Sequence, residues 1–249
     1  MLALWLLGSA TAAAHDLWMI EQKGRVLIRI GEDFPVATNG ITTDRIVFLR
    51  AVRPGGAVAL AGQAEDKQFA AALPASLPGP SLVELEVQPR LITLEAPAFN
   101  RYIRGEGFTA VIAAREKAGE TNSPGREKYS RYAKLLIEGA GDDRRLLQPL
   151  GHRLEIVPLA NPARLPAGTD VEVQILFEGK PLAGAQVSAG PAGMKGHEFP
   201  SVARTAASGR VRLGATSKGL WYVRLIHMIP GAEPDAQWRS FFATLVFHR

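Results

Sequence analysis

The sequence contains five histidines, and the first of them, His15, directly follows an apolar segment. Residues 1–14 carry no charged side chain, and Ala12 and Ala14 match the A-x-A signal that signal peptidase cleaves. Cleavage after Ala14 would make His15 the mature amino terminus. Its free α-amine and its Nδ1 atom could then close a chelate ring on one metal ion. The alternative is that His15 is merely the residue left by cleavage.

Residues 1–14 therefore predict a cleaved signal peptide and a periplasmic protein, although they lack the Lys or Arg expected at the start of such a signal. A single transmembrane anchor is the competing interpretation. This segment is shorter than the roughly 20 apolar residues that a bilayer-spanning helix needs, so we expect secretion.

His227 is the second predicted metal ligand. It follows Trp221, Val223 and Leu225 on one face of an expected strand, so it lies at the end of an apolar row. One interpretation is a structural imidazole that is hydrogen-bonded at the edge of the core. The other is a neutral imidazole that completes a site with His15, since imidazole binds nickel, cobalt, copper and zinc.

The other histidines and one carboxylate give weaker signals. His152 and His248 each lie beside an arginine, and we expect both to be exposed. His197 lies in a glycine-rich loop, where it is either a mobile third ligand or a solvated side chain. Asp16 offers either a carboxylate beside His15 or a hydrogen bond to its local backbone.

Tyr129, Tyr132 and Glu106 are further candidates. The tyrosines either line a pocket or hydrogen bond near a metal, or they simply pack in the core. The sequence contains no cysteine, which excludes thiolate ligands, and no recognisable catalytic or nucleotide-binding motif. We therefore expect no enzymatic activity. The alternative is an oxidative copper enzyme that holds its metal through an amino-terminal histidine.

The formal net charge is +5, and the Lys and Arg residues are scattered over the expected strands and turns. A basic chain can attract anionic partners, but no nucleic-acid-binding motif is recognisable. The charge indicates an ordinary basic surface and no nucleic-acid partner.

Alternating apolar residues predict short strands in the first half of the chain. Val26, Ile28 and Ile30 alternate with Leu27 and Arg29 over one such strand. Similar runs occupy residues 45–49, 57–60 and 82–88.

A helical insertion is expected at residues 98–117. Its apolar residues fall at helical spacing, which is interrupted near Gly105 and Gly107, so we expect two short helices. Residues 129–137 suit a strand by their alternation and aromatic content, with a helix as the alternative.

The composition changes at Pro158, where a proline-rich connector, residues 159–168, begins. Beyond it we expect about six short strands and no helix, as in an immunoglobulin-like sandwich without its disulfide. The fold prediction is an all-β protein with two antiparallel β-sandwich domains. Residues 15–158 form the first, which carries the short helices, and residues 159–249 form the second, which is immunoglobulin-like.

Three parts of the sequence together resemble a known family: residues 14–19 (AHDLWM), residues 99–103 with 126–134, and residues 179–185 with 225–228. The chain resembles the domain-of-unknown-function family DUF4198, whose members are labelled periplasmic components of cobalt and nickel transport systems. The resemblance covers the expected mature chain. It implies a bound nickel or cobalt ion, with copper possible, and a membrane uptake transporter as partner.

One departure from this family concerns residues 235–238, a D-x-x-W stretch. Relatives often carry an acidic residue after its tryptophan, whereas this sequence has Arg239, which would repel a nearby cation. If that acidic residue helps to hold metal in relatives, the site here is weaker or uses other ligands.

Two functions follow as hypotheses. The first is a periplasmic divalent transition-metal-binding protein that uses His15 and His227 and delivers nickel or cobalt to a membrane transporter. The second is a metal-free β-sandwich module that binds a carbohydrate, a peptide or an envelope protein.

Overall fold

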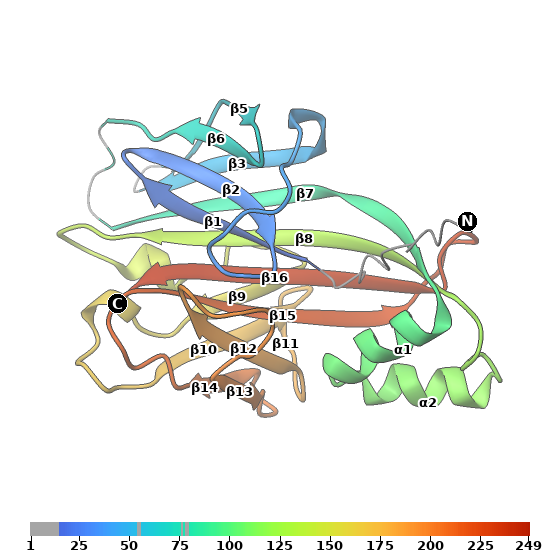
Figure 1. Ribbon diagram of the computed structural model, residues 1–249. Helices are drawn as coiled ribbons and strands as arrows, with labels where there is room; N and C mark the ends of the chain where they lie inside the picture. Colours follow the sequence, from blue (N-terminus) through green and yellow to red (C-terminus); the bar gives the residue numbers. More distant parts are fainter. Residues whose placement is uncertain (1–14, 54–55, 76, 78–79) are drawn as a thin grey trace, which may run out of the picture.

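The computed structural model describes residues 15–53, 56–75, 77 and 80–249, and strands dominate it (Figure 1). The predicted all-β sandwich class with a short helical insertion is confirmed. No helix in these described ranges is long and apolar enough to cross a membrane.

A central sheet of eight strands runs through the whole molecule (Figure 1). Neighbouring strands within this sheet are antiparallel, except for β16 and β8, which are parallel. In spatial order the strands are β13 (Ser201–Arg204), β12 (Gln186–Pro191), β15 (Leu220–Pro230), β16 (Trp238–His248), β8 (Gly125–Ile137), β7 (Ser81–Leu94), β3 (Ile46–Arg53) and β4 (Gly56–Ala59).

Two smaller sheets cover opposite faces of the central sheet. On β8, Ala133 and Leu135 pack with the first sheet, whereas Tyr132 and Leu136 pack with the second, as strand alternation requires. The first sheet contains β1 (Asp16–Gln22), β2 (Arg25–Gly31), β6 (Gln68–Ala72) and β5 (Gly62–Glu65). The second contains β9 (Leu154–Pro158), β10 (Val171–Phe177), β11 (Lys180–Pro181) and β14 (Arg210–Leu213).

The expected boundary at Pro158 falls at the end of β9, and β9 pairs with β10 across the proline-rich connector. The central sheet takes β3, β4, β7 and β8 from before Pro158 and β12, β13, β15 and β16 from after it. Each small sheet therefore packs on the central sheet to form a sandwich. The central sheet contains strands from both sides of Pro158.

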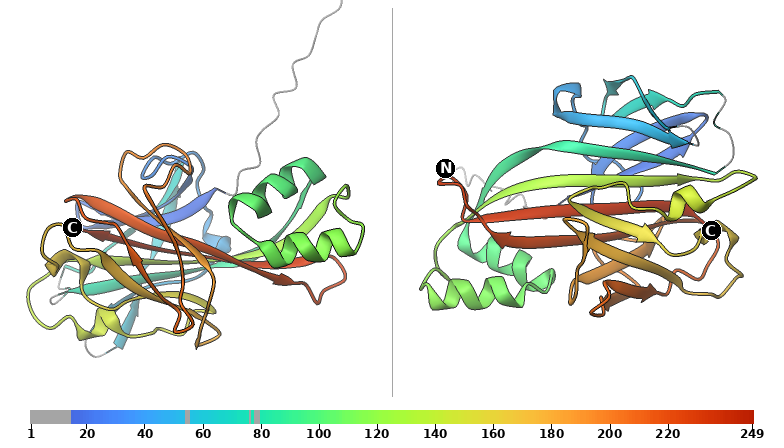
Figure 2. Two further views of the ribbon diagram at one scale, coloured as in Figure 1. Left: turned by 90° about the horizontal axis from the view of Figure 1, so that it is seen from below. Right: turned by 180° about the vertical axis from the view of Figure 1, so that it is seen from behind.

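Two helices pack at one end of the long strands, where β7 finishes (Figure 2). They are α1 (Ala96–Gly105) and α2 (Thr109–Lys117), and Gly107 between them has a φ of +70°, which suits a residue without a Cβ. This agrees with the expected pair of short helices. Phe99, Ile103 and Val111 bury one side of the pair against Met228 and Trp238 of the central sheet.

Three short 3-10 turns complete the described chain, η1 (Thr43–Arg45), η2 (Arg144–Leu147) and η3 (Pro162–Arg164). Residues 129–137, for which a helix was the alternative, are part of strand β8, which begins at Gly125.

Gly125 lets the helical insertion pack closely against the sheet. A Cβ atom at this position would lie 2.4 Å from Cγ of the fully buried Phe99 ring. We expect Gly125→Ala to lower the free energy of unfolding by about 1–3 kcal/mol, because the ring cannot move without disturbing its neighbours. Urea unfolding measures this.

Gly105→Ala is the matched control, since a Cβ there meets no atom within 4 Å and Gly105 lies in α1 without a positive φ. That variant should be neutral or slightly more stable. Equal stability of the two variants would contradict the tight helix–sheet contact.

Candidate functional site

His15 is held at the start of β1 by two contacts. Its backbone carbonyl accepts a hydrogen bond of 2.8 Å from Nη2 of Arg131 on β8. Its Nε2 atom lies 3.6 Å from Oε1 of Glu32, and its side chain stays 30% exposed. Glu32 follows β2, whose residue Gly31 pairs with Asp16. The β1–β2 ladder therefore places a carboxylate directly opposite the His15 imidazole.

The next residue, Asp16, is buried and forms part of an ion cluster with Arg224 and Glu106. Nε of Arg224 donates to Oδ1 of Asp16 at 3.0 Å, and its two terminal nitrogens donate to Glu106, each at 2.9 Å. Burial lowers the pKa of Arg224, but Asp16 and Glu106 together raise it above its ordinary value. The Asp16 carboxylate thus anchors β1 to β15.

His197 approaches the same region from the loop between β12 and β13. Its Nε2 atom lies 3.8 Å from Oδ2 of Asp16, and its side chain is 32% exposed. The loop is fixed by Asp33, which accepts a hydrogen bond of 2.8 Å from the Gly196 amide and pairs with Lys195 at 3.1 Å. Contacts between distant parts of the sequence therefore place Glu32 beside His15 and His197 beside Asp16.

The donor groups of these residues do not by themselves form a metal site. Within the described residues, no group of three or more His, Asp and Glu side chains is arranged to hold a metal ion. The Asp16 carboxylate is already bound by Arg224. The expected cleavage site at Ala12–Ala14 lies outside the described residues.

The structure does not bring His227 to His15. On β15, Tyr222 and Arg224 face the first small sheet, so the odd-numbered residues face the second. His227 accordingly packs on Phe177 of β10, with ring centroids 4.6 Å apart. Burial lowers its pKa, although Glu178 acts to raise it. His227 and His15 thus lie on opposite faces of the central sheet.

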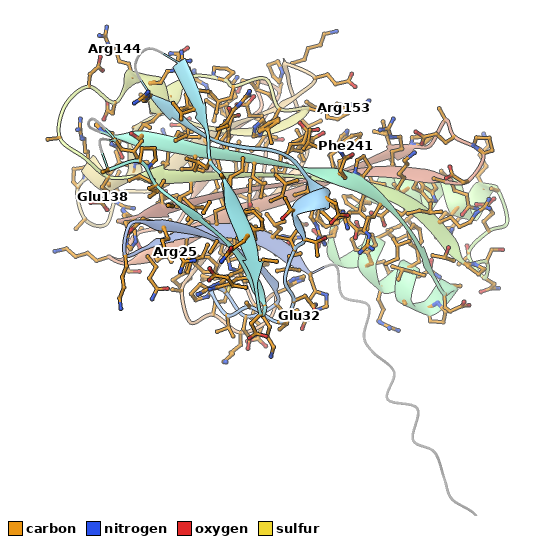
Figure 3. All side chains as sticks on the ribbon, turned by 90° about the horizontal axis from the view of Figure 1, so that it is seen from above. Arg25, Glu32, Glu138, Arg144, Arg153 and Phe241 are labelled. Atoms are coloured by element: carbon orange, nitrogen blue, oxygen red, sulfur yellow. The ribbon has the colours of Figure 1, made fainter. Side chains whose placement is uncertain are left out.

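Figure 3 shows the central sheet edge-on, with Glu32 on one side of its long strands and Arg153 and Phe241 on the other. Arg239 shares the second face, where it lies over the Phe241 ring at 5.7 Å and 3.6 Å from Glu233. The expected repulsion between Arg239 and a metal ion therefore does not bear on His15.

The expectation that His152 is exposed is wrong. Its side chain is buried, and its Nε2 atom lies 2.8 Å from Oε2 of Glu84 on β7. Burial raises the pKa of Glu84, but hydrogen bonds from His152 and Arg50 lower it below its ordinary value. The Arg beside His152 suggested a surface, whereas its partner is 68 residues away. His248 is exposed, as expected.

The two tyrosine candidates pack against other rings. Tyr132 lies 5.4 Å from the His152 ring, on the face away from His15. Tyr129 lies 5.8 Å from Phe242 and beneath the guanidinium of Arg131. The packing interpretation of both tyrosines fits these contacts.

Glu127 is a buried carboxylate that the sequence did not single out. It accepts a hydrogen bond of 3.2 Å from the Tyr102 hydroxyl of α1 and a very short one from Ser240 of β16. Burial raises its pKa to about 7, and the two hydrogen bonds only partly oppose this effect. The carboxyl group therefore lies beneath α1, joining the helix to the sheet. The expected strand began only at residue 129, so nothing in the local sequence indicated that Glu127 is buried.

The fold and the site define an all-β sandwich protein with a chemically distinctive amino-terminal edge. A family model described as a domain of unknown function, DUF4198, matches residues 12–229. The chain therefore belongs to this family. No curated protein matches the chain.

The Glu127 site generates a prediction about pH. Its folded pKa of about 7 lies above the ordinary 4.5, so folding favours the protonated carboxyl group. The resulting stability is fully present below about pH 4.5 and is lost as the pH rises through 7. The loss should approach about 3 kcal/mol. In Glu127→Gln, which keeps the acceptor oxygen but cannot ionise, this loss should disappear.

Urea unfolding of both proteins between about pH 5 and 8 measures the difference. Glu116→Gln, at an exposed position of α2, is the control and should follow the unmodified protein. A Glu127→Gln profile as steep as that of the unmodified protein would show that Glu127 is not the group responsible.

Proposed function

We propose that this protein is a periplasmic binding protein for a divalent transition-metal ion and that it is not an enzyme. The metal site is the mature amino terminus, formed by the α-amine and Nδ1 of His15. The observation that supports this most is the fixed position of His15, whose carbonyl is held by Arg131 and whose Nε2 faces Glu32.

The contact with Glu32 suits a metal ligand. Metal-binding histidines usually direct their second ring nitrogen at a carboxylate or carbonyl group, which fixes the tautomer and raises the basicity of the ligand. Because Nε2 is the ring nitrogen that faces Glu32, at 3.6 Å, Nδ1 remains available to chelate a metal together with the amine. Asp16 and Arg224 limit the motion of the backbone that carries both donors.

The identity of the metal and its destination are parts of the same proposal. The label of the family that the chain resembles implies that the metal is nickel or cobalt and that a membrane uptake transporter receives it. Neutral nitrogen donors also suit copper. The leader that ends in Ala14 supports secretion into the periplasm, because it has the apolar character and small residues of a signal peptide.

The second candidate is a metal-free β-sandwich module that binds a carbohydrate, a peptide or an envelope protein. One observation favours it, namely that side chains alone form no metal site within the described residues. Isothermal titration of metal-stripped mature protein with nickel, cobalt and copper separates the candidates. Absence of stoichiometric binding tighter than about micromolar, about −8 kcal/mol, would favour the metal-free module.

The proposal predicts that cleavage after Ala14 creates the metal site. A form with one additional Met before His15 has no α-amine at the chelating position. It should bind metal at least about tenfold more weakly than the mature form, a loss of about 1.4 kcal/mol. His227→Ala in the mature form is the control and should leave the affinity unchanged.

Equal affinity of the two amino-terminal forms would remove the amine from the site. If His227→Ala abolished binding instead, the metal would lie on the other face of the central sheet.

A further inference from the structure

We infer that the open edge of strand β15 binds the carboxyl terminus of an extended peptide. The inference does not depend on the metal site at His15 and adds a separate binding site to the molecule. It rests on a cleft between the helical insertion and the second half of the chain, with the cation Arg204 at one end.

Strand β15 is longer than the strand that covers its outer edge. It pairs with β16 over its whole length, as far as Pro230. On its other side, β12 pairs with it only from Trp221 to Leu225. Within the described chain, the edge of residues 226–230 therefore has no neighbouring strand. An extended peptide can add to such an edge through backbone hydrogen bonds.

A cleft of about 160 Å³ follows this open edge. Ile226, His227 and Met228 all line it. Successive side chains of a strand point to opposite faces, so three consecutive lining residues indicate that the cleft meets β15 at its edge. Residues 106–111 form one wall, and residues 182–186 form the other. The volume is below the roughly 300–1,000 Å³ of a pocket for a drug-sized ligand, so the cleft suits a short segment such as a chain end.

Two side chains close the cleft where β12 begins. Nε2 of Gln186 donates to the carbonyl of Gly105 at 3.0 Å, and Nη2 of Arg204 donates to the carbonyl of Gly107 at 3.3 Å. Both hydrogen bonds join the second half of the chain to the helical insertion. A peptide that continues the line of β12 along β15 must therefore end at Gln186.

The charge at this end of the cleft selects a carboxylate. Arg204 donates to two backbone carbonyl groups, and no Asp or Glu in the described part of the chain pairs with it. Glu106 lines the cleft, but both of its oxygens are already bound by Arg224. The unneutralised guanidinium attracts a terminal carboxylate and repels a terminal ammonium group. With its carboxylate at Gln186, the peptide runs in the direction of β12, antiparallel to β15.

The test uses acetylated tetrapeptides that differ only in their last residue, each prepared as a free carboxylate and as an amide. They are titrated into metal-stripped mature protein, and NMR follows the shifts of its backbone amides. Carboxylate peptides should shift the amides of Gln186 and Met228 and bind at least about tenfold more tightly than their amides. The form with an additional Met before His15 should bind them equally well, because the metal site takes no part.

Two pairs of variants test the role of Arg204. Arg204→Ala should remove the preference for carboxylates, whereas Arg210→Ala, at another exposed arginine, should keep it. Ala183→Glu places a carboxylate in an exposed part of the cleft wall, where it competes with the peptide for Arg204. Binding should weaken at least about tenfold in Ala183→Glu and much less in Ala183→Gln, which has the same size without the charge.

Equal affinity of carboxylates and amides would overturn the inference. So would an unchanged preference in Arg204→Ala, shifts confined to residues outside the cleft, or absence of binding by every peptide. None of these results bears on the metal site, which the metal titration of the mature protein tests separately.

Discussion

The buried guanidinium of Arg224 ties together three parts of the chain that are distant in sequence. It lies on β15 and binds Asp16 at the start of β1 and Glu106 between the two helices. A charge buried without partners is strongly destabilising, whereas two carboxylates and good geometry make this one tolerable. The position of His15 follows from this cluster, because its neighbour Asp16 cannot move without leaving the cation partly unpaired.

Features set by local patterns could be predicted from the sequence. Alternation gave the strands around Val26–Ile30 and residues 82–88, and helical spacing gave the pair α1 and α2. Strand β1 was not predicted, because Leu17 to Ile20 are buried on both faces and therefore show no alternation. The all-β class followed from the local patterns, but the sheet that both halves share did not.

Contacts between distant residues could not be predicted. His152 looked exposed because its partner Glu84 lies in another strand, and Glu106 meets Arg224 across 118 positions. One signal was present, since Arg224 interrupts the otherwise apolar run from Leu220 to Ile226, where an unpaired charge would be unstable. His15 and His197 were candidates from the sequence, whereas the contacts of His15 with Glu32 and of His197 with Asp16 required the fold.

The parallel pair of β16 and β8 determines when the central sheet can form. Residues 238–246 insert between β8 and β15, more than a hundred positions after β8 in the sequence. Until they are available, two long strands have open edges, and contacts of such large sequence separation form slowly. Open edges can pair with wrong partners. This molecule is therefore most vulnerable to aggregation before its synthesis is complete, when its longest strands still lack their common neighbour.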